Sequence, residues 1–198
     1  PRDSYVEEVC DDYACNYGAY DKLTHTGIYG VDTTKDTVEN LLGIDINYVF
    51  RVNFTSMIDI VDALGGIDVD VAEGMAVSKF YTNSTLEGVH EGTNHLDGKR
   101  ALAYSRERKA YIDGDVQRAR NQQQVLQAMF KKATSPEIIT KYTSLLKALT
   151  HAFDTNMSTK EITSFIKYQI QAKPSWKFEQ YVLKGDNDLQ VSPELGSE

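Results

Sequence analysis

The amino-acid sequence predicts an α/β fold, and the succession of strand, helix and strand over residues 47–71 is the main reason. NYVFRVNF, residues 47–54, is rich in β-branched and aromatic residues, a composition typical of strands. In the next segment, residues 55–66, apolar residues recur at helical spacing and a Gly-Gly pair ends the run. GIDVDV, residues 66–71, alternates apolar and polar residues as a half-buried strand does. Such a succession favours a sheet covered by helices.

Capping residues and apolar spacing predict most of the remaining elements. A proline-containing start, PRDSYV, suits the exit of a strand, and residues 7–19 are polar and tyrosine-rich, which is typical of a loop. Residues 73–96 contain many turn residues, and we expect an irregular insertion there. Residues 176–184 alternate in polarity and predict a late strand. Helices are expected from Thr33 or Thr34 to Leu42 before Gly43, from Asp97 through ALAYS, from 114 to about 132, and over 137–153 and 159–171.

Length and composition are those of one globular domain of ordinary size. The chain has 198 residues, of which 41% are hydrophobic and 25% charged. No apolar run approaches the roughly 20 residues that a membrane-spanning helix needs. The first residue is Pro1 and not Met, so we expect a processed or trimmed piece of a longer chain. The net charge of −8 argues against a nucleic-acid-binding protein, which usually carries a basic face.

Arginine is concentrated in one short stretch of this acidic chain. Five of the seven arginines lie between positions 100 and 120. On extended backbone, Arg106 and Arg108 would share one face, with Glu107 on the other. Arginine presents a planar fork that matches the oxygens of a phosphate two at a time. The stretch therefore suits a phosphate or a pyrophosphate, if its parts converge.

The helix expected from residue 114 brings further polar groups to the same region. Asp115, Arg118 and Gln122 fall at helical spacing on one face near the N-terminal end, which carries partial positive charge. Asp115 can hold a guanidinium group by a charge-assisted hydrogen bond, and Gln122 offers a neutral donor. A solvated charged helix, laced by ion pairs, is the alternative interpretation, and spacing alone does not decide between the two.

Two cysteines, Cys10 and Cys15, stand in CDDYAC, a polar segment expected to be a loop. Their spacing allows a loop disulfide, which would indicate an oxidising compartment, and two free thiols are the alternative. The spacing is not that of a CxxC redox or zinc site. The four histidines show no metal-binding spacing, so a histidine metal site is not expected.

Five segments, in this order, resemble the LytR-CpsA-Psr family of extracellular bacterial cell-envelope proteins, in particular its streptococcal CpsA-type capsule members. They cover roughly residues 1–133 and are specific in combination. The segments are PRDSYV at 1–6, DKLTHTGIYG at 21–30, TVENLLGIDINYVFRVNFTSMIDIVDALGGIDVDV at 37–71, LDGKRALAYSRER at 96–108 and DGDVQRARNQQQV at 113–125.

The resemblance implies a central mixed β-sheet flanked by helices on both faces, in a domain spanning 1–184 followed by a tail at 185–198. It also implies a polyprenyl chain in an apolar tunnel, which we expect between the 115–132 helix and the strand at 47–54. Members of the family look like ligases that move a capsule or teichoic-acid glycopolymer from a polyprenyl pyrophosphate carrier to peptidoglycan. In that chemistry a sugar hydroxyl attacks the sugar-linked phosphorus, and polyprenyl phosphate leaves.

The resemblance also assigns site residues. Arg106, Arg108, Arg118 and Gln122 match positions that contact the lipid pyrophosphate, and Asp115 matches the acidic residue tied to those arginines. Substrate-binding roles are expected for Arg2, Lys22 and Arg120.

Mg²⁺ is the cofactor that the resemblance implies. Its aspartate ligands, and a membrane helix that anchors the protein at the extracellular face of the bacterial cell membrane, are expected upstream of residue 1. We therefore expect part of the N-terminal region of the domain to be missing, and the fragment itself to be inactive if that region is essential.

Two alternatives to a ligase remain. One is a transcriptional attenuator or regulator, although no basic helix-turn-helix pattern is present. The other is a polyprenyl phosphate binding module or pyrophosphatase without ligase activity.

Overall fold

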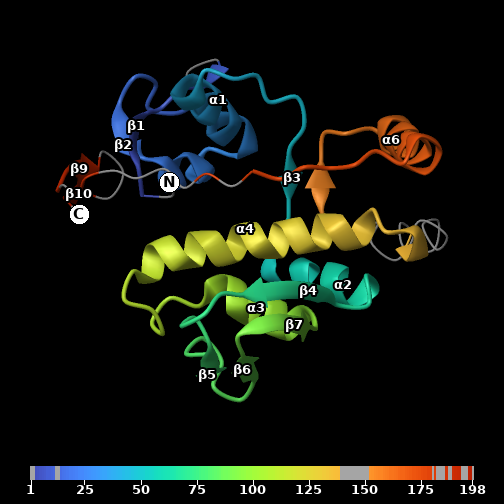
Figure 1. Cartoon of the computed structure of the whole chain (residues 1–198). Helices are drawn as coiled ribbons and strands as arrows, with labels where there is room; N and C mark the ends of the chain where they lie inside the picture. Colours follow the sequence, from blue (N-terminus) through green and yellow to red (C-terminus); the bar gives the residue numbers. More distant parts are fainter. Residues whose placement is uncertain are drawn as a thin grey trace. The chain divides into compact units, whose positions relative to one another are not determined.

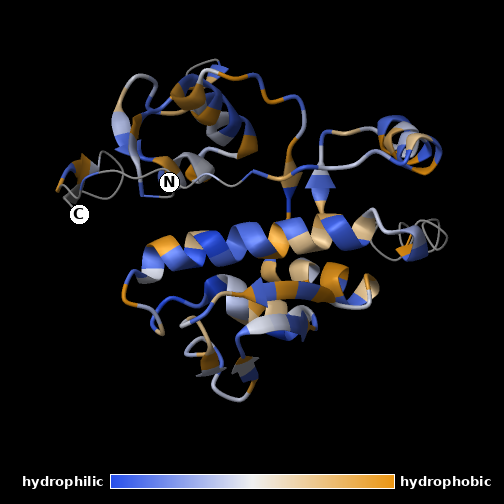
Figure 2. Ribbon diagram, in the orientation of Figure 1, coloured by the Kyte–Doolittle hydropathy of each residue, from blue (hydrophilic) through white to orange (hydrophobic). Residues whose placement is uncertain are grey.

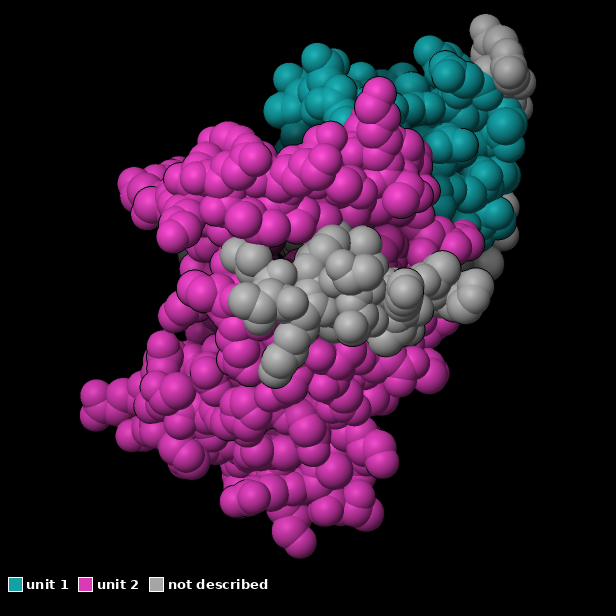
Figure 3. Space-filling view, turned by 90° about the vertical axis from the view of Figure 1, so that its right-hand side faces the viewer, with its two compact units in different colours: residues 1–49, 183–198 teal, residues 50–182 magenta. Residues whose placement is uncertain are grey.

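The protein is described by a computed structural model (Figure 1), which covers residues 3–11, 14–138, 152–179, 181, 186, 189–192 and 196–197. The chain divides into two compact units, which are drawn in different colours in Figure 3. Unit 1 contains residues 1–49 and 183–198, and unit 2 contains residues 50–182. The expected domain over 1–184, with its tail, stays a prediction. No helix among the described residues is both long enough and apolar enough to cross a membrane.

Unit 1 is built from short strands and two helices. Strand β1 (Tyr5–Glu7) pairs antiparallel with β2 (Tyr20–Lys22), which leads into the 3₁₀ helix η2 (Leu23–Ile28) and then α1 (Val31–Leu42). Helix α1 ends at Gly43, whose φ of 64° is the left-handed conformation that glycine adopts without strain. The helix ends at Leu42, before Gly43, as predicted. It begins at Val31, two residues before Thr33, because its N-cap is Gly30. Strand β9 (Val191–Ser192) pairs with β10 (Gly196–Ser197) and contacts β2.

Unit 2 has three packed helices around one antiparallel strand pair. Asn53 caps α2 (Phe54–Ala63), and its side chain accepts a hydrogen bond from the Ser56 amide at 2.8 Å. Strand β4 (Ile67–Val71) alternates buried and exposed residues, as its sequence predicts, and pairs with β7 (Gly92–Leu96). Helices α3 (Gly98–Arg106) and α4 (Gly114–Ala133) confirm the two helices expected there, and α4 packs against both α3 and β4 (Figure 1).

The remaining elements of unit 2 are a second strand pair, a short strand pair and a late helix. Strand β5 (Val77–Lys79) pairs with β6 (Glu87–Val89), and β3 (Phe50–Arg51) pairs with β8 (Asp154–Thr155). Helix α6 (Thr159–Ala172) confirms the helix expected over 159–171, and Ser158 with Glu161 forms its capping box.

Several strand predictions are wrong. Of the strand expected over 47–54, only Phe50–Arg51 is assigned as a strand, β3, and it pairs with the two-residue β8. The irregular insertion expected over 73–96 contains β5, β6 and β7, since strand pairing depends on distant segments that local turn residues do not reveal. Described residues of the segment 176–184 are not in a strand. The helix expected over 137–153 falls mostly on residues 139–151, outside the described ranges.

The α/β class is confirmed by this mixture of helices and strands. Where one central mixed sheet was expected, the strands of the described residues form five two-stranded antiparallel pairs. The main hydrophobic core lies in unit 2, where α2, α3, α4 and the β4–β7 pair meet. Val61, Ile67, Leu96, Ala101 and Val125 are almost completely buried in it. This core supports the two helix ends between which the arginine stretch lies.

Candidate functional site

Asp115 joins two of the predicted site arginines. It lies in the first turn of α4, and its Oδ1 is 2.9 Å from Nη2 of Arg118 and 3.5 Å from Nη1 of Arg108. The Asp115 and Arg108 side chains are 64% and 51% exposed, whereas that of Arg118 is 20% exposed. Ion pairs this exposed contribute little to stability. Two guanidinium groups and a helix N-terminus with one carboxylate leave net positive charge, which suits an anion.

Glu107 organises the segment that carries Arg108. Its side chain is completely buried, and Oε1 accepts hydrogen bonds from the amides of Arg108 at 2.9 Å and Ala110 at 3.3 Å. Oε2 accepts a hydrogen bond of 2.6 Å from the amide of Tyr81, which lies in the segment that connects β5 to β6. The carboxylate therefore ties the arginine segment to a distant part of unit 2. Sequence reasoning placed Glu107 opposite the arginines and missed this role.

Close backbone contact also positions Arg108. A Cβ atom at Gly114 would meet the carbonyl oxygen of Arg108, so the first residue of α4 has room for glycine alone without a shift. The Tyr111 amide donates a hydrogen bond of 3.3 Å to the same oxygen. The segment between α3 and α4 is thereby a tight turn that holds Arg108 beside the start of α4.

Arg106 makes a different contact from Arg108 and Arg118. It is the last residue of α3, and its guanidinium carbon lies 4.4 Å from the centre of the Phe54 ring, in a cation–π contact. It also lines a pocket together with residues of α2 and α3. Ion pairs thus connect Arg108, Asp115 and Arg118, while Arg106 is held by stacking.

The other two predicted residues of α4 are exposed. Gln122 lies one turn after Arg118 on the same face, as expected. Arg120 is about 200° around the helix from Arg118 and therefore belongs to another face. The structure thus places Gln122 beside the arginine cluster, which we define as Arg108, Asp115 and Arg118, and it does not place Arg120 there.

In the first half of α4, the buried face is polar. Gln117 donates a hydrogen bond of 2.9 Å to Asn121, and Asn121 donates one of 3.1 Å to the carbonyl oxygen of Tyr104. The Tyr104 hydroxyl donates a hydrogen bond of 2.6 Å to Gln124. Burial raises the pKa of Tyr104, so the hydroxyl stays neutral and remains a donor. These bonds set the rotation of α4, in which Arg118 is half-buried and contacts Asp115.

Hydropathy predicts the buried face of α4 only in part. Apolar spacing predicts Val116, Ala119, Leu126 and Phe130, with Val125 and Met129 beside them. Val125 is buried and Met129 packs against the core, as predicted, whereas Leu126 is 65% exposed. Figure 2 shows that hydrophobic residues concentrate in the second half of this helix. In the first half, buried amides take the place of apolar residues, which a hydropathy pattern does not reveal.

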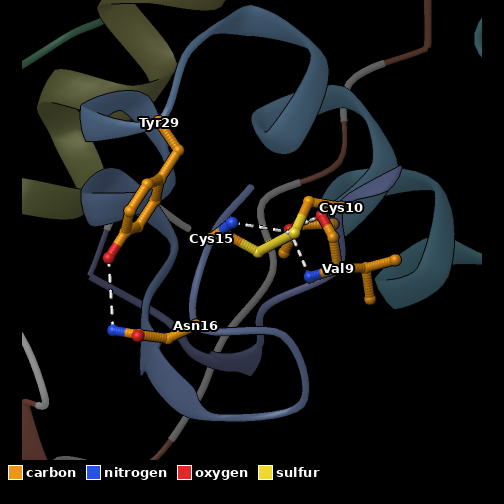
Figure 4. Close-up of a disulfide and its surroundings, with 6 residues drawn as sticks. Val9, Cys10, Cys15, Asn16 and Tyr29 are labelled. Carbon is orange, nitrogen blue, oxygen red and sulfur yellow. Dashed lines mark hydrogen bonds between the residues drawn. A yellow bond between two sulfur atoms is a disulfide. The ribbon is translucent and has the colours of Figure 1, made fainter. Parts of the chain in front are cut away.

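A disulfide joins Cys10 and Cys15 in unit 1 (Figure 4). The Cys15 amide lies 3.1 Å from Sγ of Cys10, and the neighbouring Val9 amide donates a hydrogen bond of 3.0 Å to Thr37 of α1. Beside the disulfide, Asn16 donates a hydrogen bond of 3.2 Å to the Tyr29 hydroxyl (Figure 4). The disulfide and these bonds connect the loop after β1 to α1 and to the end of η2.

Comparison with known proteins shows the family of this chain. The family model of the LytR_cpsA_psr family matches residues 1–192. The chain belongs to this family. It is 34% identical over 187 residues to the polyisoprenyl-teichoic acid–peptidoglycan teichoic acid transferase TagU of Bacillus licheniformis, across 94% of this chain and 56% of that protein. This LytR_cpsA_psr chain thus spans about half the length of the curated relatives that it matches.

Solved structures support the same family and fold. Protein gbs0355 of Streptococcus agalactiae has a TM-score of 0.77 and 27% identity, over 100% of this LytR_cpsA_psr chain and 66% of that chain. The structure of TagT bound to LI-WTA has a TM-score of 0.67 and 32% identity, over 85% of this chain and 60% of that chain. The resemblance inferred from the ordered sequence motifs is therefore confirmed.

Two predicted substrate-binding residues of this LytR_cpsA_psr chain belong to unit 1. Arg2 lies outside the described residues. Lys22 ends β2, directly after the buried Asp21. The Lys22 amide donates a hydrogen bond of 2.6 Å to Asp21, which also accepts one of 2.9 Å from Ser192 and contacts Nδ1 of His25 at 2.8 Å. The backbone at Lys22 is therefore fixed by a buried carboxylate.

A Mg²⁺ site requires several oxygen ligands, of which carboxylates are the usual ones in proteins. The described part of this LytR_cpsA_psr chain contains no group of three or more His, Cys, Asp or Glu residues that could hold a metal ion. Asp115, the carboxylate of the arginine cluster, is occupied by two guanidinium groups. The described residues do not fit a Mg²⁺ site.

Several apolar side chains of unit 2 are exposed on the elements near the expected lipid tunnel. They include Phe50 and Phe54 near β3, and Phe165, Trp176 and Phe178 at and after α6. Trp176 and Phe178 both contact the ring of Phe130 in α4. A large contiguous patch of exposed apolar residues is typical of a ligand or partner site. A pocket lined by described residues lies between α2 and α3. The tunnel between α4 and β3 stays a prediction.

Proposed function

We propose that the protein transfers a glycopolymer of the teichoic-acid or capsule type from a polyprenyl pyrophosphate carrier to peptidoglycan. The observation that carries the proposal is the arginine cluster, in which Asp115 holds Arg108 and Arg118 beside the start of α4. Family membership supports it, because relatives such as TagU are named as teichoic acid transferases that act on a polyisoprenyl-linked polymer and peptidoglycan.

In this proposal Arg108 and Arg118 neutralise the pyrophosphate. A hydroxyl oxygen of the acceptor forms a bond to the sugar-linked phosphorus, while the bond from that phosphorus to the bridging oxygen breaks. The bridging oxygen keeps the electron pair and leaves as polyprenyl phosphate, and the hydroxyl proton passes to solvent. Negative charge develops on the phosphoryl oxygens and on the leaving oxygen, so fixed guanidinium groups stabilise the transition state. Gln122 adds a neutral donor, and Asp115 holds the arginines.

The proposal has three further parts that rest on the family resemblance. We place the activity at the extracellular face of the bacterial cell membrane, with the protein anchored by a transmembrane helix. We include capsule polymers among the substrates. Mg²⁺ is proposed as the cofactor, with ligands other than the described residues. The Cys10–Cys15 disulfide is consistent with an extracellular location, because disulfides persist in oxidising compartments.

The test is binding and turnover of a polyprenyl pyrophosphate-linked saccharide by full-length protein. Hydrogen bonds to charged groups are strong enough that Arg108→Ala and Arg118→Ala should each weaken lipid binding by about tenfold to a hundredfold. Lys160→Ala on α6 is the control, because this lysine is exposed and lies outside the cluster. If both arginine variants bind and turn over the lipid as the parent does, the cluster is a solvated charge network and the proposal is wrong.

Turnover also separates the ligase from the binding module and the pyrophosphatase. A ligase incorporates the saccharide into peptidoglycan. A pyrophosphatase releases polyprenyl phosphate and phosphorylated saccharide in the absence of peptidoglycan. Binding without either product would indicate a module without catalysis and would contradict the proposed transfer.

A further inference from the structure

A second polar surface lies directly beside Arg106, outside the arginine cluster. It is a pocket of about 120 Å³ between α2, α3 and the segment that connects β5 to β6. Ile58 of α2, Leu102 of α3 and Leu86 of the connecting segment supply its apolar part, and all three are half-buried. A pocket of this size is much smaller than one that encloses a drug-sized molecule, so it suits one small ring or one unit of a polymer.

The charged groups of the pocket are donors. Lys99 and Arg106 bring two positive charges, and none of the eight lining residues is acidic. This is unusual in a chain of net charge −8, where carboxylates outnumber basic side chains by 29 to 21. Two cations without a carboxylate between them repel each other and favour a bound anion.

Asn83 adds a neutral donor whose orientation is determined by its neighbour. Its Oδ1 accepts hydrogen bonds from the Thr85 amide at 3.2 Å and from the Thr85 hydroxyl at 2.7 Å. Because a backbone N–H can only donate, the atom facing it must be the carbonyl oxygen of the Asn83 side chain. The NH₂ group of Asn83 is therefore the end available to a ligand.

Arg106 is also held in place. Its guanidinium group lies over the Phe54 ring at 4.4 Å, which limits its rotation. It precedes Arg108 by two residues, so the pocket lies next to the arginine cluster along the chain. A ligand in the pocket would be close to the predicted pyrophosphate site.

We propose that this pocket binds an anionic saccharide unit. Fixed donors recognise hydroxyl, acetamido and anionic oxygens, and the half-buried apolar residues contact the face of a sugar ring. The proposal rests on the proposed function, in which both reactants supply such units. Peptidoglycan carries carboxylates on its muramyl peptides, and teichoic-acid polymers carry phosphates. Divalent cations are excluded by the absence of acidic lining residues, and a polyprenyl chain by the charges and the size.

The test measures binding of three soluble probes by NMR titration of the purified protein. Muramyl dipeptide carries a carboxylate, glycerol 3-phosphate carries a phosphate, and N-acetylglucosamine is the neutral control. We expect at least one anionic probe to bind more tightly than N-acetylglucosamine and to shift the methyl signals of Ile58 and Leu102. A preference for the carboxylate assigns the pocket to the acceptor, and a preference for the phosphate assigns it to the donor polymer.

Two variants test whether the probes bind in this pocket. Lys99→Met keeps the aliphatic stem and removes the charge, and Asn83→Asp keeps the acceptor for Thr85 while it replaces the donor with a charged oxygen. Each should weaken binding of the preferred anionic probe by about three- to tenfold, whereas Lys160→Met should bind as the parent does. The proposal is wrong if no anionic probe binds better than N-acetylglucosamine, or if both pocket variants bind like the parent. Because the probes require no turnover, this failure is distinct from a failure of the lipid transfer assay.

Discussion

Glu107 shows how a single side chain positions an arginine without touching a ligand. The pattern Arg-Glu-Arg at 106–108 is ordinary in a charged segment, and only burial reveals the carboxylate as an internal acceptor for three backbone amides. A buried acceptor of this kind is costly to remove, because the donors are left without partners in a site that excludes water. The same bonds fix the backbone from which Arg108 reaches Asp115.

Replacement of Glu107 by alanine should therefore destabilise unit 2. We expect Glu107→Ala to lower the free energy of unfolding by about 2–4 kcal/mol, since three amides lose their acceptor. Glu107→Gln should be milder, because one oxygen remains. Denaturant unfolding of the purified protein measures both changes. Glu179→Ala is the control, because its ion pair with Lys177 is exposed and should change stability by less than about 1 kcal/mol. Equal stability of the Glu107→Ala variant and the parent would contradict the role assigned to Glu107.

Asp21 predicts a pH dependence in unit 1. Burial acts to raise the pKa of Asp21, but hydrogen bonds from the Lys22 amide, Ser192 and His25 outweigh burial and lower it. A carboxyl whose pKa is lower in the folded state stabilises the fold above its unfolded pKa, and this contribution is lost as the pH falls through the folded pKa.

We therefore expect Asp21→Asn to reduce stability at neutral pH and to differ less and less from the parent as the pH falls below about 4. Thermal unfolding of the parent and the variant between neutral and acidic pH measures this difference. Asp186→Asn is the control, because Asp186 belongs to the same unit and is exposed. A stability difference that stays constant over the whole pH range would show that the charge of Asp21 is not involved.

At the scale of single elements, the disulfide is the local constraint whose effect is easiest to measure. Cys15 follows Cys10 by five positions, so the bond closes a small loop. From loop length alone, removing it should cost about 2 kcal/mol of stability in unit 1. The double variant Cys10→Ala/Cys15→Ala, compared with the parent in denaturant unfolding, tests this value. Thiol titration of denatured, unreduced parent should detect no free thiol, and two free thiols per chain would show that the bond is absent.

Local signals predicted the helices better than the strands. Gly43 ends α1, Asp97 caps α3, and the charged start of α4 was placed correctly, because caps and helical spacing are properties of neighbouring residues. Strand β3 was predicted too long, and β5, β6 and β7 were missed, because a strand depends on the segment with which it pairs.

The candidate site was predicted in part, because sequence spacing shows local relations and not contacts between distant segments. Asp115, Arg118 and Gln122 share a face by helical periodicity, which sequence spacing determines. The buried acceptor Glu107 and the donor pocket at Lys99 depend on residues that are distant in the chain, namely Tyr81 and Asn83. Hydropathy also missed the polar part of the buried side of α4, where Gln117 donates a hydrogen bond to Asn121. Sequence reasoning predicted the charged residues of the candidate site and missed the contacts that hold them.

At the scale of the whole molecule, the distribution of charge distinguishes a transferase that binds a pyrophosphate from a transcriptional regulator that binds DNA. The net charge is −8, yet five of seven arginines lie within residues 100–120. Non-specific DNA binding requires several phosphates to be neutralised along a basic face, and its affinity falls steeply with salt. One arginine cluster in an acidic chain can neutralise a pyrophosphate but cannot follow a duplex. A transcriptional regulator should instead carry an extended basic surface.

This difference gives a direct test on the full-length protein. We expect no retardation of a short DNA duplex in a gel at physiological ionic strength, because the acidic surface repels the phosphate backbone. Under the same conditions a polyprenyl pyrophosphate should bind, and Arg118→Ala should weaken that binding because the guanidinium group beside Asp115 is lost. The Lys160→Ala variant should behave as the parent does in both assays. A duplex that is retarded by the parent, is released as salt is raised and is no longer retarded by Arg118→Ala would assign the cluster to nucleic acid and contradict the transferase proposal.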